Sequence, residues 1–307
     1  MLRFILRRLG FIIAVSLGII FFSFFGIRLA RNSTARTPDY NPVPAVRYAA
    51  ISTADYVEGL LRGELGTMLR GSGRQRRAAA VRDVLADVYP KSLGLLTLSL
   101  LLATGIGVPL GAYAALRRRK ARSTALLTLT LIGISLPSFT AAALLQLGEI
   151  YWYRTFGFRL VPVGGFGWDA HLVIPTLVLA ARPLAHLTRI AYMAFYEVLE
   201  QDYMRTAEAK GLLRRAITLG HAYPNAAVPV LTGIGVSVRY SLASLPVVEY
   251  FIGWPGIGAA LLDAIRQQQA QAVAGLALAL GLTFMLLNLT LEVLYRVADP
   301  RLRGQRL

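Results

Sequence analysis

The sequence predicts an all-α integral membrane protein with six transmembrane helices and both termini in the cytoplasm. Hydrophobic residues make up 55% of the 307-residue chain, above the 45–50% or so of a soluble domain. They are gathered into long apolar runs rather than spread evenly. The chain also carries a net charge of +17, and most basic residues flank these runs, where they would face lipid headgroups and fix orientation.

A helix needs about 20 predominantly apolar residues to cross the hydrocarbon core of a bilayer. Six stretches of the chain meet this requirement: Leu9–Ile27, Leu93–Leu116, Thr124–Gly148, Leu172–Met193, Ala226–Val248 and Ala272–Tyr295. Six helices this long and this apolar are not the pattern of a soluble protein.

The first span could alternatively be a cleaved signal peptide, because Arg3, Arg7 and Arg8 form a basic region before it. Its apolar run, Leu9–Ile27, is longer than the 7–15 residues or so of a signal-peptide core. No clean cleavage site of small residues follows it. We therefore expect an uncleaved span.

Basic residues in short loops predict the orientation of the spans. With the N-terminus inside, the two short outside loops hold only Arg154, Arg159 and Arg266. The long first outside loop, residues 28–92, is also basic, but loops longer than about 60 residues cross largely regardless of charge. The cytoplasmic segments would hold the larger set: Arg3, Arg7, Arg8, Arg117, Arg118, Arg119, Lys120, Arg122, Arg205, Lys210, Arg214, Arg215, Arg296, Arg301, Arg303 and Arg306.

The predicted spans divide the chain into two regions. Residues 1–92 hold the first span and the long extracytoplasmic loop, in which the spacing of apolar residues over Ala54–Leu69 predicts a short amphipathic helix. Residues 93–304 form the core with spans two to six. Its cytoplasmic segment 194–225 reads as two short helices with a bend at Gly211 and a stop at Pro224.

Several function classes lack the residues that they need. Neither a phosphate-binding G-x-x-x-x-G-K-[ST] loop nor a G-x-S-x-G elbow occurs. Cysteine is absent, and His171, His186 and His221 have no metal-ligand spacing, so they are better explained as structural histidines. We therefore expect no catalytic residue, metal site or resident cofactor, and no nucleic-acid partner.

Two other functions remain as alternatives. A secondary transporter driven by an ion gradient would show inverted repeats and broken helices in matching halves, and neither is apparent. An intramembrane enzyme would need catalytic residues paired across spans, and no such set is evident.

Six motifs, in order along the chain, carry a specific resemblance. The segment "QDYMRTAEAKGL" followed by "HAYPNAAVPV" resembles the cytoplasmic loop of the permeases of ABC importers, and "VVEYFIGWPGIG" resembles the fifth-span motif of their peptide/nickel branch. Within the loop, Ala207, Gly211 and Pro224 match the family pattern, whereas Arg205 and Thr206 replace its first two positions, as is typical of that branch. The matching segments are Leu60–Thr67, His171–Ala180, Gln201–Leu212, His221–Val230, Val247–Gly258 and Asp299–Gly304.

The resemblance implies a type I ABC importer permease in a bacterial or archaeal cytoplasmic membrane, for peptides or related small solutes. Such a permease supplies half of a translocation path, in contact with membrane lipid. The partners that it implies are a second homologous permease subunit, two ABC ATPase subunits that hold the ATP and magnesium, and an extracytoplasmic substrate-binding protein.

The resemblance also implies that the cytoplasmic segment couples the spans to an ATPase subunit. Its basic side chains would supply charge for an acidic docking surface, whereas an ordinary solvated loop would turn the same charges toward water. The residues assigned to this role are Arg205, Thr206, Ala207, Lys210, Gly211 and Pro224, with additional charge from Arg214 and Arg215.

Charged residues inside the spans form a second candidate site. A central arginine costs about 2.5–3.5 kcal/mol on the insertion scale, so it usually faces a partner or a water-filled path. Arg239, with Tyr240 and Arg182, is a candidate for the translocation path and for meeting an anionic group, or alternatively for a structural ion pair with a neighbouring helix. Arg189 could extend to the inner interface. We assign the outer gate or loop to Glu249, Trp254, Pro255 and Gly256.

Overall fold

The computed structural model describes residues 2–33, 42–70, 77–117 and 121–298. Contacts divide the chain into two compact units. The first comprises Met1–Leu93 with Gly253–Leu287, and the second comprises Gly94–Ile252 with the residues from Asn288 onward. The expected motif Asp299–Gly304 lies outside the described residues.

The described residues are mainly helical. Five helices are long and apolar enough to cross a membrane, and one bent pair makes six if it counts as a single span. The long helices are α1 (Leu2–Ser33), α3 (Val81–Leu116), α6 (Val173–Leu199), α9 (Tyr223–Ile252) and α11 (Ala270–Ala298), and the bent pair is α4 (Ala121–Ser135) with α5 (Ser138–Phe156). These positions agree with five of the six predicted spans.

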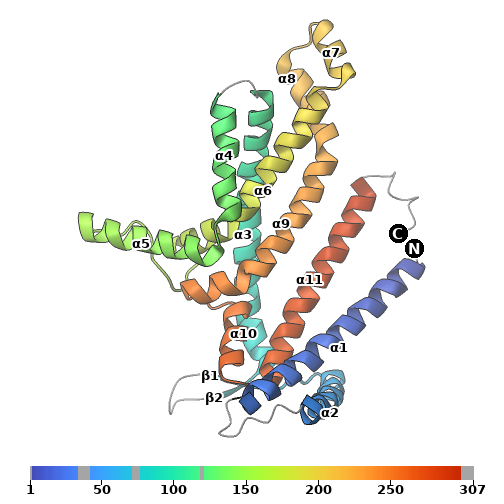
Figure 1. Cartoon of the computed structure of the whole chain (residues 1–307), viewed down its shortest axis with the longest axis vertical. Helices are drawn as coiled ribbons and strands as arrows, with labels where there is room; N and C mark the ends of the chain where they lie inside the picture. Colours follow the sequence, from blue (N-terminus) through green and yellow to red (C-terminus); the bar gives the residue numbers. More distant parts are fainter. Residues whose placement is uncertain (1, 34–41, 71–76, 118–120, 299–307) are drawn as a thin grey trace. The chain divides into compact units, whose positions relative to one another are not determined.

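The third predicted span, Thr124–Gly148, is not one continuous helix. Helices α4 and α5 meet at an angle of 105°, and Figure 1 shows α5 leaving the direction of α4 in the second unit. The break falls at Leu136 and Pro137. Pro137 is extended, with φ −61° and ψ 141°. Proline provides no N–H for the helix and disfavours helical geometry at the residue before it, which explains the break.

The first outside loop also differs from its prediction. Helix α2 covers Pro42–Leu61 instead of Ala54–Leu69. It begins at a proline, which the first turn tolerates because the N–H there has no helical partner. It ends before Gly63, whose φ of +83° lies in the left-handed region. The predicted helix is thus correct for its first half and wrong beyond Leu61.

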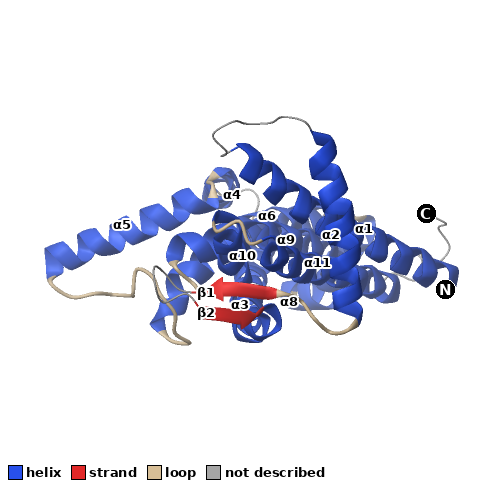
Figure 2. Cartoon of the chain, turned by 90° about the horizontal axis from the view of Figure 1, so that it is seen from below, coloured by secondary structure: helices blue, strands red, loops and turns tan. Residues whose placement is uncertain are grey.

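The segment after α2 forms a small antiparallel hairpin that the sequence did not predict. Strand β1 (Thr67–Arg70) pairs with β2 (Arg77–Ala80), with Leu69 opposite Ala78, as the paired arrows in Figure 2 show. On the other side of β1, the N–H of Leu69 donates to Oε1 of Gln269 at 2.7 Å, and Nε2 of Gln269 donates to the Leu69 carbonyl at 3.1 Å. The Gln269 side chain therefore takes the place of a third strand at this residue.

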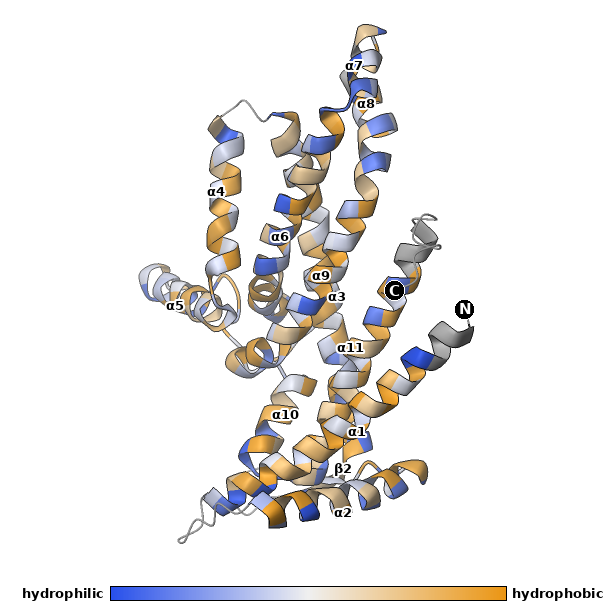
Figure 3. Cartoon of the chain, turned by 45° about the vertical axis from the view of Figure 1, so that its right-hand side comes forward, coloured by the Kyte–Doolittle hydropathy of each residue, from blue (hydrophilic) through white to orange (hydrophobic). Residues whose placement is uncertain are grey.

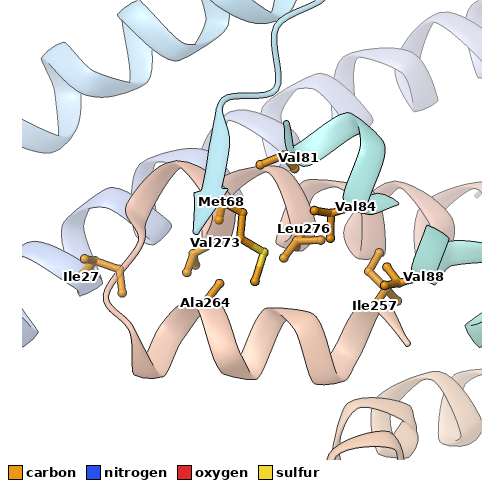
Figure 4. Packing of buried hydrophobic residues seen from close by; sticks show 10 residues of the cluster. Ile27, Met68, Val81, Val84, Val88, Ile257, Ala264, Val273 and Leu276 are labelled. Carbon is orange, nitrogen blue, oxygen red and sulfur yellow. The ribbon is translucent and has the colours of Figure 1, made fainter. Parts of the chain in front are cut away.

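Apolar side chains hold the first unit together. Val81, Val84 and Val88 lie on one face of α3, because residues three or four apart share a helix face. They pack with Ile257 of α10 (Ile257–Arg266) and Leu276 of α11, and Figure 4 shows these side chains converging. A neighbouring cluster contains Tyr56, whose hydroxyl donates to the Leu65 carbonyl at 3.1 Å. Burial raises the pKa of Tyr56 to about 12.

The second unit is built around close helix contacts. Gly107 and Gly111 lie one turn apart on α3 and face α6. A Cβ at Gly107 would lie 2.9 Å from the Leu184 carbonyl, and one at Gly111 would lie 2.6 Å from the Ala191 Cβ. Small residues of this kind let membrane helices approach closely. Helix α6 in turn packs extensively on α9.

Candidate functional site

The cytoplasmic segment joins α6 to α9. Helix α7 (Asp202–Ala209) is followed by α8 (Arg214–Ile217), by the π-helical turn η3 (Thr218–Ala222) and then by α9. Between α7 and α8 the predicted bend is present, because Gly211 has φ +74°. The Leu212 N–H donates to the Ala207 carbonyl at 3.3 Å, which is the bond of a helix end that a left-handed glycine allows.

The inner face of this segment is packed rather than solvated. Met204 and Ala207 of α7 are 2% and 7% exposed. They belong to a buried cluster that also contains Ile217 of α8, Phe195 of α6 and Ala112 of α3. The two short helices thus pack against residues of the long helices α3 and α6.

The solvent-exposed side chains of the cytoplasmic segment are both apolar and basic. Arg205 and Lys210 are exposed, and Arg205 lies 3.7 Å from both the Glu200 and the Asp202 carboxylates. Exposed ion pairs of this length contribute little to stability. Leucine and tyrosine side chains of the segment are exposed as well: Tyr203 is 44%, Leu212 44%, Leu213 79% and Leu219 56% exposed.

Two of the assigned residues have modest structural roles. The Thr206 hydroxyl donates to the Asp202 carbonyl at 3.0 Å within α7. Pro224 does not stop the segment, contrary to the prediction, because it lies in the first turn of α9. The wider turn η3 precedes it, and the chain continues from Arg215 to Ile252 as one helical stretch. Pro224 is therefore in the first turn of α9, directly after the wider turn η3, where the regular α-helical hydrogen bonds begin.

The arginines inside the spans have different surroundings. Arg239 donates from Nε to Oδ1 of Asn288 on α11 at 2.8 Å. This bond has a neutral partner, unlike the ion pair that was the alternative. The Arg182 guanidinium carbon lies 4.5 Å from the centre of the Tyr240 ring. The His186 ring meets the same tyrosine edge-on, with centroids 5.3 Å apart. The structure thus brings Arg182 and Tyr240 together.

The third set of assigned residues lies at the end of α9 and in the turn that follows it. Glu249, at the end of the second unit, is fully buried within α9. Trp254, in the first unit, is also fully buried, and its indole N–H donates to the Lys91 carbonyl at 3.3 Å. Pro255 lies between Trp254 and Gly256 in a tight turn, in which the Gly256 N–H donates to the Trp254 carbonyl at 2.8 Å.

An outer loop contains residues that sequence reasoning missed. Glu149 of α5 is 6% exposed, and its Oε1 accepts the backbone N–H groups of Leu160 and Val161 at 2.8 and 3.3 Å. One turn earlier, Gln146 donates to the Val163 carbonyl at 2.6 Å. A carboxylate directly after the apolar predicted span Thr124–Gly148 was the signal that could have identified Glu149.

A turn in the same loop precedes α6. Oδ1 of Asp169 accepts the backbone N–H of His171 at 2.9 Å and lies 2.6 Å from its Nδ1. The hydrogen bond from the His171 backbone is the main cause that lowers the pKa of the exposed Asp169 carboxyl below its usual value, and the bond to the His171 side chain lowers it further. Among the described residues, no group of three His, Asp or Glu side chains could hold a metal ion.

Comparison with known proteins decides the family. The model of the family described as "Binding-protein-dependent transport system inner membrane component" matches residues 107–304. The chain belongs to this family. The match covers α4 to α11 and the whole cytoplasmic segment. It also includes Glu149 and the turn from Glu249 to Gly256.

Curated relatives match almost the whole permease. It is 30% identical over 345 residues to the dipeptide transport system permease protein DppB of Escherichia coli (strain K12), with 100% of both chains covered. It is 31% identical over 342 residues to the di/tripeptide transport system permease protein DppB of Pseudomonas aeruginosa, also with 100% of both covered. A probable peptide ABC transporter permease protein of Sinorhizobium fredii is 30% identical over 319 residues, covering 98% of this chain and 99% of the relative.

Membership of the family identifies the chain as a multi-pass transport permease of the inner membrane rather than an enzyme. It is a subunit of an ATP-driven importer, and the alternative of a secondary transporter is set aside. The family also implies a substrate-binding protein and an ABC ATPase as partners.

Proposed function

We propose that this permease forms half of a translocation path for peptides or related small solutes. The other half would be a second, homologous permease subunit, and two ATPase subunits would bind and hydrolyse ATP with magnesium. The relatives described as permeases for dipeptides, for di- and tripeptides and for peptides support this substrate class. Both termini would lie in the cytoplasm, as the basic loop residues predict.

The packing of the cytoplasmic segment carries the proposed mechanism. One face of α7 and α8 is buried against α6 and α3, while Leu212, Leu213 and Leu219 remain exposed beside basic side chains. An exposed apolar surface rimmed by charge is typical of a protein interaction site. We infer that an ATPase subunit covers this surface and that its movement on ATP binding is passed through the buried cluster to the spans.

Substitution of Gly211 tests the coupling. Proline fixes φ near −65°, so Gly211→Pro cannot adopt the φ of +74° and should disrupt the segment. Asparagine tolerates the left-handed region, so Gly211→Asn should cost about 1 kcal/mol or less, no more than about a fivefold change. We expect Gly211→Pro to abolish ATP-dependent uptake of a labelled dipeptide in proteoliposomes, and Gly211→Asn to retain it.

The same preparation provides the controls. Equal yields of both variants in the membrane would show that insertion is intact, and co-purified ATPase subunits would be identified by mass spectrometry. Normal uptake by Gly211→Pro would contradict the coupling role. Uptake that follows an ion gradient without ATP, by a chain that purifies alone, would contradict the whole proposal.

A further inference from the structure

Three arginines lie within the candidate spans α6 and α9: Arg182, Arg189 and Arg239. In the described part of the chain, none of them forms an ion pair with a carboxylate. Ionisable side chains at this depth usually face a partner or a water-filled path, because lipid solvates them poorly. The question is which of the three can take an anionic ligand.

Arg239 already has a fixed structural role. Its Nε donates to the Asn288 side chain at 2.8 Å and thereby ties α9 to α11. The bond fixes the position of the guanidinium relative to two helices. Arg239 is therefore a tether between spans, and it offers a matched control for the neighbouring arginine.

Arg182 is held differently. Its guanidinium lies over the Tyr240 ring at 4.5 Å, and His186 packs edge-on against the same ring. A guanidinium held over an aromatic ring can keep the N–H groups in its plane available to a second partner. That plane matches a carboxylate, which can accept two parallel hydrogen bonds from it. Tyr240 thus holds the Arg182 guanidinium in a position from which its N–H groups can donate to a carboxylate.

The surroundings of Arg182 are polar along one line of α6. Arg182, His186 and Arg189 follow at spacings of four and three residues, so they share one face of the helix. Figure 3 shows hydrophilic bands along α6 between apolar ones. Arg182 lies nine residues after the start of α6, about 14 Å along the axis at 1.5 Å per residue. This depth separates it from the headgroup layer at that end.

Polar atoms without a partner lie on the facing helices. The His186 Nε2 and the hydroxyls of Ser237 and Ser241 are buried and make no hydrogen bond within the described structure, and both serines are fully buried in α9. Buried polar groups are normally satisfied. These unpaired polar atoms on α6 and α9 are a second observation, besides the arginines, that points to a polar ligand near Arg182.

We propose that Arg182, positioned by Tyr240, binds the free carboxylate of a transported peptide and makes the permease favour substrates that carry one. This inference rests on the proposed function and assigns the substrate group that the path recognises. Arg189, further along the same face, continues the positive stripe. A hydrogen bond to a charged group contributes about 1.5–3 kcal/mol, which corresponds to a preference of about 10- to 150-fold.

The test compares a labelled tripeptide with its C-terminal amide in proteoliposomes that contain the complete transporter. The binding protein also discriminates between the two, so the measured quantity is the acid-to-amide uptake ratio of each variant divided by that of the wild type. We expect Arg182→Gln to lower this ratio at least tenfold by reducing uptake of the acid. Arg239→Gln, the matched control, should leave it unchanged.

A chemical rescue provides an independent arm. Since the chain has no cysteine, Arg182→Cys introduces a single thiol into this permease. Modification with an aminoethyl methanethiosulfonate restores a cation and should recover acid uptake. The sulfonatoethyl reagent adds an anion and should not.

The outcomes separate the two proposals. Wild-type proteoliposomes that take up neither peptide with ATP would overturn the proposed function. Uptake of both peptides, with a ratio that Arg182→Gln does not change, would overturn only the role of Arg182. An equal fall for both peptides, or an introduced thiol that neither reagent reaches, would assign Arg182 to the assembly of the subunits instead.

Discussion

Glu149 shows how a single buried carboxylate can organise an outer loop. Its Oε1 accepts two consecutive backbone N–H groups, from Leu160 and Val161, and Gln146 holds the Val163 carbonyl nearby. Two side chains of α5, one turn apart, thus hydrogen-bond to the backbone of the loop that leads to α6. Charge-assisted bonds of this kind are about twice as strong as neutral ones.

Removing this fastening should expose the loop to proteolysis. Glu149→Ala loses both bonds, at a cost of about 1.5–3 kcal/mol, whereas Glu149→Gln keeps an acceptor oxygen. We expect trypsin to cut after Arg159, next to the released Leu160, at least about tenfold faster in the alanine variant. Cleavage after the exposed Arg62 is the internal reference. Equal rates at Arg159 in all three proteins would show that Glu149 does not hold the loop.

Residue types could be predicted from the sequence, but their partners could not. The charges at Arg182, Arg239 and Glu249 stand out in apolar runs of the sequence, whereas the contact of Arg182 with the Tyr240 ring is visible only in the structure. The Asn288 partner of Arg239 is 49 residues away on another helix. That Arg239 meets Asn288 depends on tertiary packing that no local pattern records.

At the scale of elements, the contact of α3 with α6 depends on the absence of a side chain. A Cβ at Gly111 would lie 2.6 Å from the Ala191 Cβ and 2.8 Å from the Tyr192 nitrogen, both on α6. Gly105, on the same helix, has no atom within 4 Å of such a Cβ. Alanine substitutions at these two glycines therefore distinguish the effect of helix–helix packing from the effect of helix propensity.

Gly111→Ala should destabilise the second unit, because overpacking costs about 1–3 kcal/mol. Gly105→Ala should be neutral or stabilising by up to about 1 kcal/mol, since alanine is the better helix former. We expect a midpoint of thermal unfolding in detergent that is lower by several degrees for Gly111→Ala only. An unchanged midpoint for Gly111→Ala would mean that α3 and α6 are less closely packed.

The positions of the long helices could be predicted from the length of the apolar runs, but the position of the break within a span could not. Pro137 separates α4 from α5, yet Pro183 lies inside α6, and Pro229 and Pro246 lie inside α9. A proline interrupts a span only where nothing else satisfies the freed backbone groups. The hairpin β1–β2 was missed for a related reason, since its four-residue strands are too short for a clear period.

At the scale of the whole molecule, the charge distribution predicts the topology. Basic residues concentrate in the segments assigned to the cytoplasm, in keeping with the usual excess there. Leu61, the last residue of α2, would then lie on the outer side of the membrane. Leu213, which follows the bend at Gly211, would lie on the cytoplasmic side. Both side chains are strongly exposed, at 84% and 79%.

Single cysteines at these positions test the topology directly, because the chain has none of its own. In cells that produce the permease without the ATPase subunits, a membrane-impermeant maleimide should label Leu61→Cys in spheroplasts and Leu213→Cys only after lysis. The similar exposure of the two sites makes them a matched pair. The reverse pattern would place both termini outside and would remove the cytoplasmic segment from the reach of an ATPase.

The membrane class and the family were apparent from composition and motif order, but the grouping of segments was not. Gly253–Leu287 belongs to the same unit as the N-terminal stretch, although the predicted boundary at residue 92 places it in the core. Contacts such as that of Trp254 with the Lys91 carbonyl join residues 163 positions apart. Such pairings arise from the tertiary fold and leave no periodic signal.

The Gln269 side chain has a consequence for a protein whose proposed cargo is an extended chain. An uncovered β-edge is a template onto which a peptide can add itself as a further strand. At Leu69, the N–H and C=O that would form this template are both occupied by the Gln269 amide. The Gln269 amide thus occupies both backbone groups of Leu69 that an added strand would need.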